Sequence, residues 1–293
     1  SMVRSGLALC GLCVGLLVGA GSAHATFPGA AGNLIVLGDH QAPPCVVTAT
    51  QSCRNVPEAD ICPDTIYWVD VSTGTSTPLI RLPDSDECPP NVRIDPTGMR
   101  LLTGDFSRLR IVAIDALAAG WQRVATAHPG FEPVWAADGT QVVYNSGRNG
   151  GPLRVISLSD KRSRALFPAG WSTEDWSIRG QLLLQRDYNR GPKTGFAVVS
   201  ARGKVLRRTR VTGNTPRWSP DGRSFVFTKR GAVLIGTPTG TSARRLTDWG
   251  GSLSDPVWSP AGDVIAANCG ACEPDAVYLL PARPTAPAPT TSD

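Results

Sequence analysis

Hydrophobic and polar positions along most of this chain form short alternating runs that are separated by turn residues. The clearest unit begins at Trp218, passes through Pro-Asp-Gly at 220–222 and continues into Ser-Phe-Val-Phe-Thr at 224–228. Branched and aromatic residues favour strands, while proline, aspartate and glycine favour a tight turn. Further turns lead to an apolar run at 232–236 and to a last short segment at 244–247. The pattern predicts four short strands that form one antiparallel sheet.

The same unit recurs about every 41 residues. The apolar anchors before the turns step by 41, 41, 42 and 40 residues: Ile94, Trp135, Trp176, Trp218 and Trp258. The turn glycines step identically: Gly98, Gly139, Gly180, Gly222 and Gly262. A four-stranded unit with a fixed period of this length is typical of a β-propeller blade. We therefore expect an all-β propeller whose tryptophans are core residues between neighbouring blades, where such a ring buries roughly 150–250 Å².

A sixth unit begins near the start of the chain, because Gly-Asn-Leu-Ile-Val-Leu at 32–37 matches the run at 222–227. The predicted six-bladed propeller spans 26–282, and its blades lie at about 32–90, 91–131, 132–172, 173–214, 215–254 and 255–282. In the first blade 65–71 and 77–82 have the pattern of the third and fourth strands, and only 26–28 can supply an inner strand. The last blade lacks an obvious outer strand after 276–280. Residues 283–293, rich in proline and threonine, are predicted to be a disordered tail. We therefore expect the ring to be weakly closed between the first and last blades.

The repeat also resembles a known family. Trp-Ser-Pro-Asp-Gly at 218–222 and Trp-Ser-Pro-Ala-Gly at 258–262 are similar to the signature of TolB-like propellers, which are relatives of the WD-type repeats. The resemblance covers nearly all of 32–282 and implies the propeller fold, without the N-terminal domain of TolB itself. Other copies depart from the signature; Ile94, for example, replaces the tryptophan in the first. The resemblance does not by itself assign a function, because one fold serves many.

The first 25 residues have the pattern of a secretory signal peptide. Arg4 precedes an apolar run at 7–18, which Ala-His-Ala follows at 23–25. We therefore predict a signal peptide at 2–25, and a mature protein that is secreted or lies in the periplasm or cell envelope. No other segment reaches the 18 apolar residues of a membrane span. We also expect a monomer.

Six cysteines follow the predicted signal peptide, and an even number in an exported protein indicates disulfides: Cys45, Cys53, Cys62, Cys88, Cys269 and Cys272. The two in Cys-Gly-Ala-Cys also have the spacing of half a zinc site or a redox pair, but the export signal favours disulfides. Propeller topology places all six on one face, beside the junction of the first and last blades. The bonds either cross this junction or join neighbours in sequence, as Cys45–Cys53, Cys62–Cys88 and Cys269–Cys272.

Candidate ligands lie about seven residues after the turn glycines, where a propeller places them at one mouth of its central channel. They are Asp39, Asp105 and Asp187, with Asn145 and Asn268 at matching positions and His40 beside the first aspartate. Carboxylate and amide oxygens are the ligands that calcium prefers, so calcium is the one cofactor that this set suggests. The alternative is structural, because aspartate and asparagine also suit strand ends and open turns.

The chain has a formal net charge of +5, and its basic residues are unevenly distributed. Many fall on the outer hairpins and outermost strands predicted for the third to fifth blades: Lys161, Arg162, Arg164, Arg202, Lys204, Arg207, Arg208, Arg210, Arg244 and Arg245. Charges on outer strands prevent edge-to-edge aggregation. Alternatively, they form an electrostatic surface for an anionic envelope polymer. Nucleic acid is not expected as a partner, because no aromatic residues alternate with these charges.

Catalytic motifs are scarce. Only His40 and His128 follow the predicted signal peptide, and the Gly-x-Ser-x-Gly sequence of the α/β-hydrolases is absent. We therefore expect an exported binding or interaction module whose partner is a protein or an envelope polymer. The alternative is an extracytoplasmic metal-dependent hydrolase or a lactonase-like enzyme, with its metal held at the channel mouth by Asp39, Asp105 and Asp187.

Overall fold

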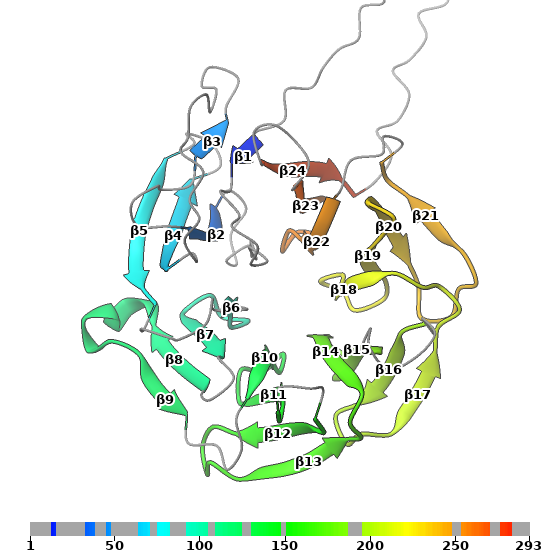
Figure 1. Ribbon diagram of the computed structural model, residues 1–293, viewed down its shortest axis with the longest axis horizontal. Coiled ribbons are helices and arrows are strands. Elements are labelled where there is room, and N and C mark those ends of the chain that lie inside the picture. Colours follow the sequence, from blue (N-terminus) through cyan, green and yellow to red (C-terminus); the bar gives the residue numbers. More distant parts are fainter. Residues whose placement is uncertain are drawn as a thin grey trace, which may run out of the picture.

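The computed structural model describes residues 13–15, 33–38, 45–47, 64–70, 75–82, 92–104, 109–124, 130–147, 151–186, 195–247, 253–269 and 276–282. Within these residues the strands form six antiparallel sheets, which are arranged around a ring (Figure 1). The only helix in this part of the chain is the short 3-10 helix η1 (Ile114–Ala119). No helix among the described residues is long and apolar enough to cross a membrane.

Four of the sheets have four strands each, paired in chain order. We name each sheet a blade after its innermost strand. The β6 blade has β6 (Val92–Ile94), β7 (Arg100–Gly104), β8 (Leu109–Ala113) and β9 (Gln122–Val124). The β10 blade has β10 (Phe131–Trp135), β11 (Gln141–Asn145), β12 (Leu153–Ser157) and β13 (Ser163–Phe167). The β14 blade has β14 (Trp171–Trp176), β15 (Gln181–Arg186), β16 (Ala197–Ser200) and β17 (Val205–Arg208). The β18 blade has β18 (Asn214–Trp218), β19 (Phe225–Lys229), β20 (Ala232–Gly236) and β21 (Ala243–Arg245).

The remaining two sheets meet where the ring closes. The β2 sheet has three strands, β2 (Asn33–Gly38), β4 (Thr65–Asp70) and β5 (Ser76–Arg81). The β22 blade has five strands in the order β22-β23-β24-β1-β3, and these are β22 (Leu253–Trp258), β23 (Val264–Cys269), β24 (Ala276–Pro281), β1 (Cys13–Gly15) and β3 (Cys45–Val47). The all-β propeller with four-stranded antiparallel blades is confirmed. Five sheets have four or more strands, whereas the sequence predicted six four-stranded blades; 26–28 lies outside the described residues.

The ring junction differs from the prediction in one respect. The last blade was expected to lack an outer strand, but β1 pairs with β24, and β3 pairs with β1. Because β1 lies within the predicted signal peptide 2–25, cleavage after Ala25 would remove it from this sheet. β3 comes from the insert that follows β2, so the first part of the chain reaches across the junction to the last blade.

The repeated turns explain why the period is so regular. All five turn glycines have positive φ, from 64° to 76°, which glycine adopts without steric cost. The residue after the anchor closes the turn: Ser219 Oγ donates to Asp221 Oδ1 at 2.6 Å and accepts from the Ser224 N–H at 3.0 Å. Asp95 has this role in the β6 blade, where its Oδ1 accepts from the N–H groups of Met99 and Arg100.

The tryptophans pack between blades, as predicted. Trp218 is 5% exposed and lies in one core cluster with Leu183 and Phe196 of the β14 blade and Phe225 of its own blade. Trp135 packs in the same way against residues of the β6 blade, and its Nε1 donates to the Arg93 carbonyl at 3.3 Å. The hydrophobic core of the molecule is therefore a series of clusters at the blade interfaces.

Candidate functional site

A bulge interrupts the inner strand of four blades at the same place in the repeat. The strand registers shift at Phe131–Val134, Thr173–Asp175, Asn214–Arg217 and Ser254–Val257. Three bulge residues have positive φ: Glu132 at 49°, Thr215 at 48° and Asp255 at 48°. A bulge re-aims side chains, and such backbone strain is concentrated at functional sites. The bulges therefore indicate that a functional site lies along the inner strands.

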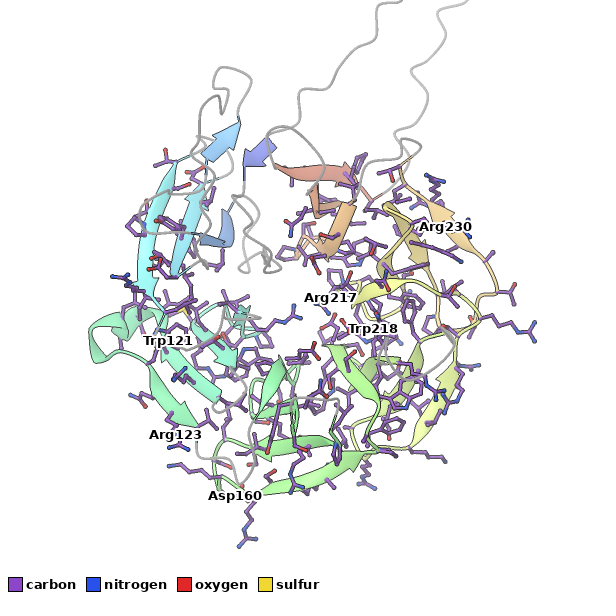
Figure 2. The ribbon with its side chains drawn as sticks, viewed as in Figure 1. Trp121, Arg123, Asp160, Arg217, Trp218 and Arg230 are labelled. Carbon is purple, nitrogen blue, oxygen red and sulfur yellow. The ribbon has the colours of Figure 1, made fainter. Side chains whose placement is uncertain are left out.

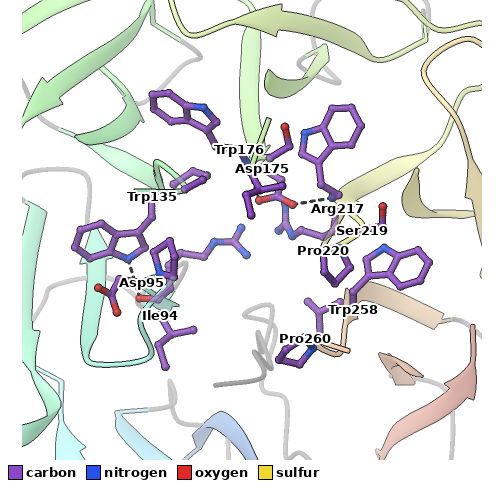
Figure 3. Close-up of a pocket in the computed structure, with 18 of the residues that line it drawn as sticks. Ile94, Asp95, Trp135, Asp175, Trp176, Arg217, Ser219, Pro220, Trp258 and Pro260 are labelled. Atoms are coloured by element: carbon purple, nitrogen blue, oxygen red, sulfur yellow. Dashed lines mark hydrogen bonds between the residues drawn. The ribbon is translucent and has the colours of Figure 1, made fainter. Parts of the chain in front are cut away.

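A pocket of about 390 Å³ lies where these inner strands end. It is lined by the ends of five inner strands and the turns that follow them, at 93–96, 134–137, 174–178, 217–220 and 257–260. Figure 3 shows Trp135, Trp176 and Trp258 around it, with Pro220 and Pro260 at the turns. We call this the turn-side pocket. Its walls are mostly apolar, and it contains charged groups from three strands.

Three of the charged residues, Arg93, Asp175 and Arg217, each lie one residue before the apolar anchor of their blade. Arg217 is 6% exposed, and its Nη1 donates to Glu174 Oε2 at 3.2 Å and to the Glu174 carbonyl (Figure 2). Asp175 accepts from two backbone N–H groups, that of Trp176 at 2.8 Å and that of Trp218 at 2.7 Å. The second of these bonds joins the β14 and β18 blades beside the pocket.

Burial dominates the ionisation of this cluster. Desolvation raises the pKa of both Asp175 and Asp255 above the ordinary value, although the charge of Arg217 opposes the shift. Desolvation, followed by the charge of Glu174, raises the pKa of Glu132 to about 7. Desolvation and the nearby charge of Arg217 lower the pKa of Arg93 to about 10. The carboxyl groups of this cluster therefore keep their protons to higher pH than isolated side chains would, and Arg93 releases its proton at lower pH.

Four residues of the pocket lining also carry buried hydrogen-bond donors that have no partner among the described residues. They are Arg93 Nε, Arg217 Nε, Trp218 Nε1 and Trp258 Nε1. The unpaired buried acceptors Asn145 Oδ1, Thr173 Oγ1 and Thr215 Oγ1 belong to residues that do not line it. Because an unpaired buried polar group is costly, each of these donors favours a bound acceptor.

The predicted candidates lie at the other end of the inner strands or outside the described residues. Asn145 is 1% exposed, stands opposite Phe131 at the start of β10, and donates to Glu132 Oε2 at 2.6 Å. Asn268 is also buried and stands opposite Ser254. The other four candidates lie outside the described residues: Asp39, His40, Asp105 and Asp187. The described residues hold no group of three metal-ligating side chains.

The backbone of the β22 blade constrains one predicted disulfide. Cys269 stands opposite Ala276, Ala276 opposite Gly15, and Gly15 opposite Cys45. The two cysteines are thus three strands apart, which corresponds to about 14 Å between Cα atoms. A disulfide needs Cα atoms closer than about 7 Å, so a Cys45–Cys269 bond does not fit this arrangement. Cys53, Cys62, Cys88 and Cys272 lie outside the described residues, and the other pairings stay predictions.

The turn-side pocket was missed because the sequence analysis placed the site at the opposite channel mouth. Arg93, Asp175 and Arg217 each directly precede an apolar anchor, and this common position was the available signal. Two periods separate Arg93 from Asp175 and one period separates Asp175 from Arg217, so the three residues share a level of the ring. The unpaired donors depend on the packing between blades, which no local pattern reveals.

Solved structures similar to this one are propellers. TolB from Acinetobacter baumannii matches with a TM-score of 0.57 and 13% identity, over 89% of this chain and 76% of that chain. A putative TolB from Agrobacterium tumefaciens matches with a TM-score of 0.58 and 17% identity, over 70% of this chain and 77% of that one. An oligogalacturonate lyase in complex with manganese matches with a TM-score of 0.55 and 12% identity, over 92% of this chain and 90% of that one.

Sequence comparison is less informative. No protein-family model matches the chain. The uncharacterized peptidase YuxL of Bacillus subtilis is 36% identical over 90 residues, which is 29% of this chain. The chain spans only 13% of the length of that relative. The structural matches, at identities below 25%, show the fold, and the chain has the β-propeller fold of TolB-like proteins over most of its length.

Proposed function

We propose that the protein is an exported, TolB-like, six-bladed propeller that acts as a binding module, and that the turn-side pocket holds a peptide segment of a partner protein. The observation that carries this proposal is the set of four unpaired donors in a pocket with apolar walls. A peptide segment presents carbonyl acceptors together with apolar side chains. Ligand sites commonly combine apolar walls with a few converging polar groups.

The charge of the pocket supports a neutral acceptor over a free anion. Arg93 and Arg217 lie within electrostatic range of Glu174, Asp175 and Asp255. The acidic groups already balance the two guanidinium groups, so an additional negative charge would gain little. A carbonyl oxygen satisfies the unpaired N–H groups without adding charge.

The six-bladed ring is supported by the number and order of the sheets. The β2 sheet stands between the β22 and β6 blades in the ring (Figure 1), with two of its strands where the sequence predicted the third and fourth strands of the first blade. With a strand from 26–28 it would be the sixth four-stranded blade. Export, with residence outside the cell or in the envelope, rests on the predicted signal peptide.

The enzymatic alternative stays a prediction. The oligogalacturonate lyase with its manganese shows that a similar fold accompanies a metal in that protein. Here Asp39, Asp105 and Asp187, which would hold the metal, lie outside the described residues. The unpaired donors of the turn-side pocket favour an acceptor-rich ligand, so binding is the function that we propose.

Replacing Trp258 by phenylalanine tests the binding proposal. A peptide is first selected from a random library on the intact protein, and its affinity is then measured by calorimetry. Trp258→Phe keeps an aromatic ring but removes Nε1, which has no partner among the described residues. Losing one hydrogen bond to the peptide should weaken binding by about 3- to 10-fold.

The matched control is Trp121→Phe. Trp121 lies outside the pocket, and its Nε1 donates to the Arg81 carbonyl at 2.9 Å (Figure 2). This variant should bind the selected peptide as the parent protein does. Equal affinities for the parent and Trp258→Phe would contradict the assigned role of the unpaired donors, as would failure to select any peptide.

A further inference from the structure

Positive charge is concentrated in one part of the ring. Residues 195–247, which form the outer half of the β14 blade and all of the β18 blade, contain eleven lysines and arginines and a single acidic residue, Asp221. This segment alone carries a net charge of +10, whereas the whole chain carries +5. Asp221 is held in its turn by Ser219 and by the Arg223 N–H. A charge of one sign on one side of a protein attracts ligands of the opposite sign.

A groove of about 440 Å³ lies within this positive region. One side is the end of β17, with Arg207 and Arg208, and the residues that follow, with Arg210; the other is the hairpin at 238–241 that leads into β21. Figure 1 shows β17 and β21 at the periphery of the ring, whereas the turn-side pocket is lined by the ends of the inner strands. The groove is therefore separate from the peptide site proposed above.

The shape of β17 brings several side chains to the groove. Val198 pairs with Arg207, but Val199 pairs with Val205, so Leu206 is an extra residue that forms a bulge. All four residues of β17 are exposed, and Leu206 is 43% exposed. A bulge breaks the alternation of an edge strand and re-aims its side chains. Leu206 and the two arginines after it consequently line the same groove.

Protection of the sheet edge does not fully explain why the arginines of the groove are there. Other arginines of the outer strands are engaged: Arg164 donates to the Ala201 carbonyl, Arg244 to the Ala282 carbonyl and Arg245 to the Thr247 carbonyl. Arg208 lies over the Trp171 ring, 5.1 Å from its centroid.

The guanidinium groups of Arg207 and Arg210 have no hydrogen bond or ion pair with any residue that the structure describes. Both are exposed on the wall of the groove. They are therefore available to a ligand.

The lining indicates the kind of ligand. Guanidinium groups bind carboxylate and sulfate groups in bidentate geometry. The hydroxyls of Thr239 and Thr241 suit sugar hydroxyls, and Leu206 offers an apolar contact for a sugar ring. None of the described residues that line the groove is aromatic, and single-stranded nucleic acids are bound largely by stacking on aromatic residues. We propose that this groove binds an acidic polysaccharide through its carboxylate or sulfate groups, with Arg207 and Arg210 as the main contacts.

The test compares two variants that lose the same charge. Arg207→Gln/Arg210→Gln removes the two available guanidinium groups of the groove. Arg123→Gln/Arg162→Gln removes two exposed arginines elsewhere on the ring. Calorimetry measures the binding of an oligogalacturonate, which carries carboxylates, and of a carrageenan-derived oligosaccharide of equal charge, which carries sulfates and no carboxylates. Neutral dextran is the blank, and thermal melts check that both variants are folded.

We expect the groove variant to bind the preferred acidic oligosaccharide about tenfold more weakly than the parent protein, because two exposed ion pairs are lost. The control variant should lose less than about twofold. The oligosaccharide that binds more tightly identifies the anionic group that the groove prefers. Equal losses in both variants would overturn the proposal, because binding would then depend on net charge alone. Tighter binding of a single-stranded oligonucleotide of equal charge would also overturn it, as would no binding of either sugar.

Discussion

Replacing Trp218 by alanine is expected to lower the free energy of unfolding by about 3–5 kcal/mol, which is typical when a large buried aromatic side chain is removed from a core. The ring of Trp218 is 5% exposed and stands edge-on to Phe225, with centroids 6.0 Å apart. It also packs with Leu183 and Phe196 of the preceding blade. Its Nε1 has no partner in the described residues, so the expected loss comes from packing alone.

Urea denaturation of the parent protein and the variant measures this difference. Ile178→Ala is the control, because Ile178 lies in the corresponding turn of the β14 blade but is 70% exposed. It should change the stability by less than about 0.5 kcal/mol. A loss of less than about 1 kcal/mol for Trp218→Ala would show that packing of the tryptophans does not hold the blades together.

The second large effect is a pH dependence of the folding stability, which arises from the ionisation of Glu132. The pKa of this carboxyl is about 7 in the folded protein, against an ordinary value of 4.5. Between these values the folded state keeps a proton that the unfolded state has released. Glu132 therefore makes the protein less stable as the pH rises from 4.5 to 7, and its full cost, of the order of 3 kcal/mol, applies above pH 7.

Glu132→Gln removes this ionisation but keeps an oxygen to accept the bond from Asn145. We expect the variant to match the parent protein near pH 4.5 and to be more stable by about 1–3 kcal/mol at pH 8. Asp138→Asn is the control: Thr140 holds the pKa of Asp138 below its ordinary value, so this variant should keep the parent's loss of stability between pH 4.5 and 8. If Glu132→Gln and the parent protein have the same pH profile, then the carboxyl is ionised normally in the fold.

Much of the fold could be predicted because each repeat contains local signals that agree with one another. Gly222 needs positive φ, Ser219 and Asp221 close the turn, and Trp218 fills the interface. The same positions recur once per period, so one well-formed copy was enough to align the others. β4 and β5 also lie where the first predicted unit placed its third and fourth strands.

The ring junction could not be predicted in the same way. β1 and β3 are three residues each, and neither carries the repeat motif. The place of β1 beside β24 depends on pairing between segments more than 200 residues apart in the chain, and β3 joins the sheet by pairing with β1. No local pattern specifies such pairing, whereas the turn signals specify pairing between neighbours.

The candidate site shows the same contrast. The charges of Arg93, Asp175 and Arg217 could be read from the sequence, together with their common position before the anchor. Whether each buried hydrogen-bond donor near these charges finds a partner depends on how closely the next blade approaches. For example, Trp135 Nε1 donates to the Arg93 carbonyl, while Trp218 Nε1 and Trp258 Nε1 have no partner among the described residues. The unpaired donors that define the site are therefore a property of the packed ring.

Hydrogen–deuterium exchange on the intact protein, with and without a peptide selected for binding, tests the central claim most directly. The proposal predicts slower exchange on peptide binding in the turns of the turn-side pocket, at 95–100, 136–141, 177–181, 219–224 and 259–264. The turn at 229–232, at the other end of the inner strands, should exchange at an unchanged rate. Protection at 229–232 and around Asn145, with none in the five turns, would contradict the proposal and place the site at the opposite mouth.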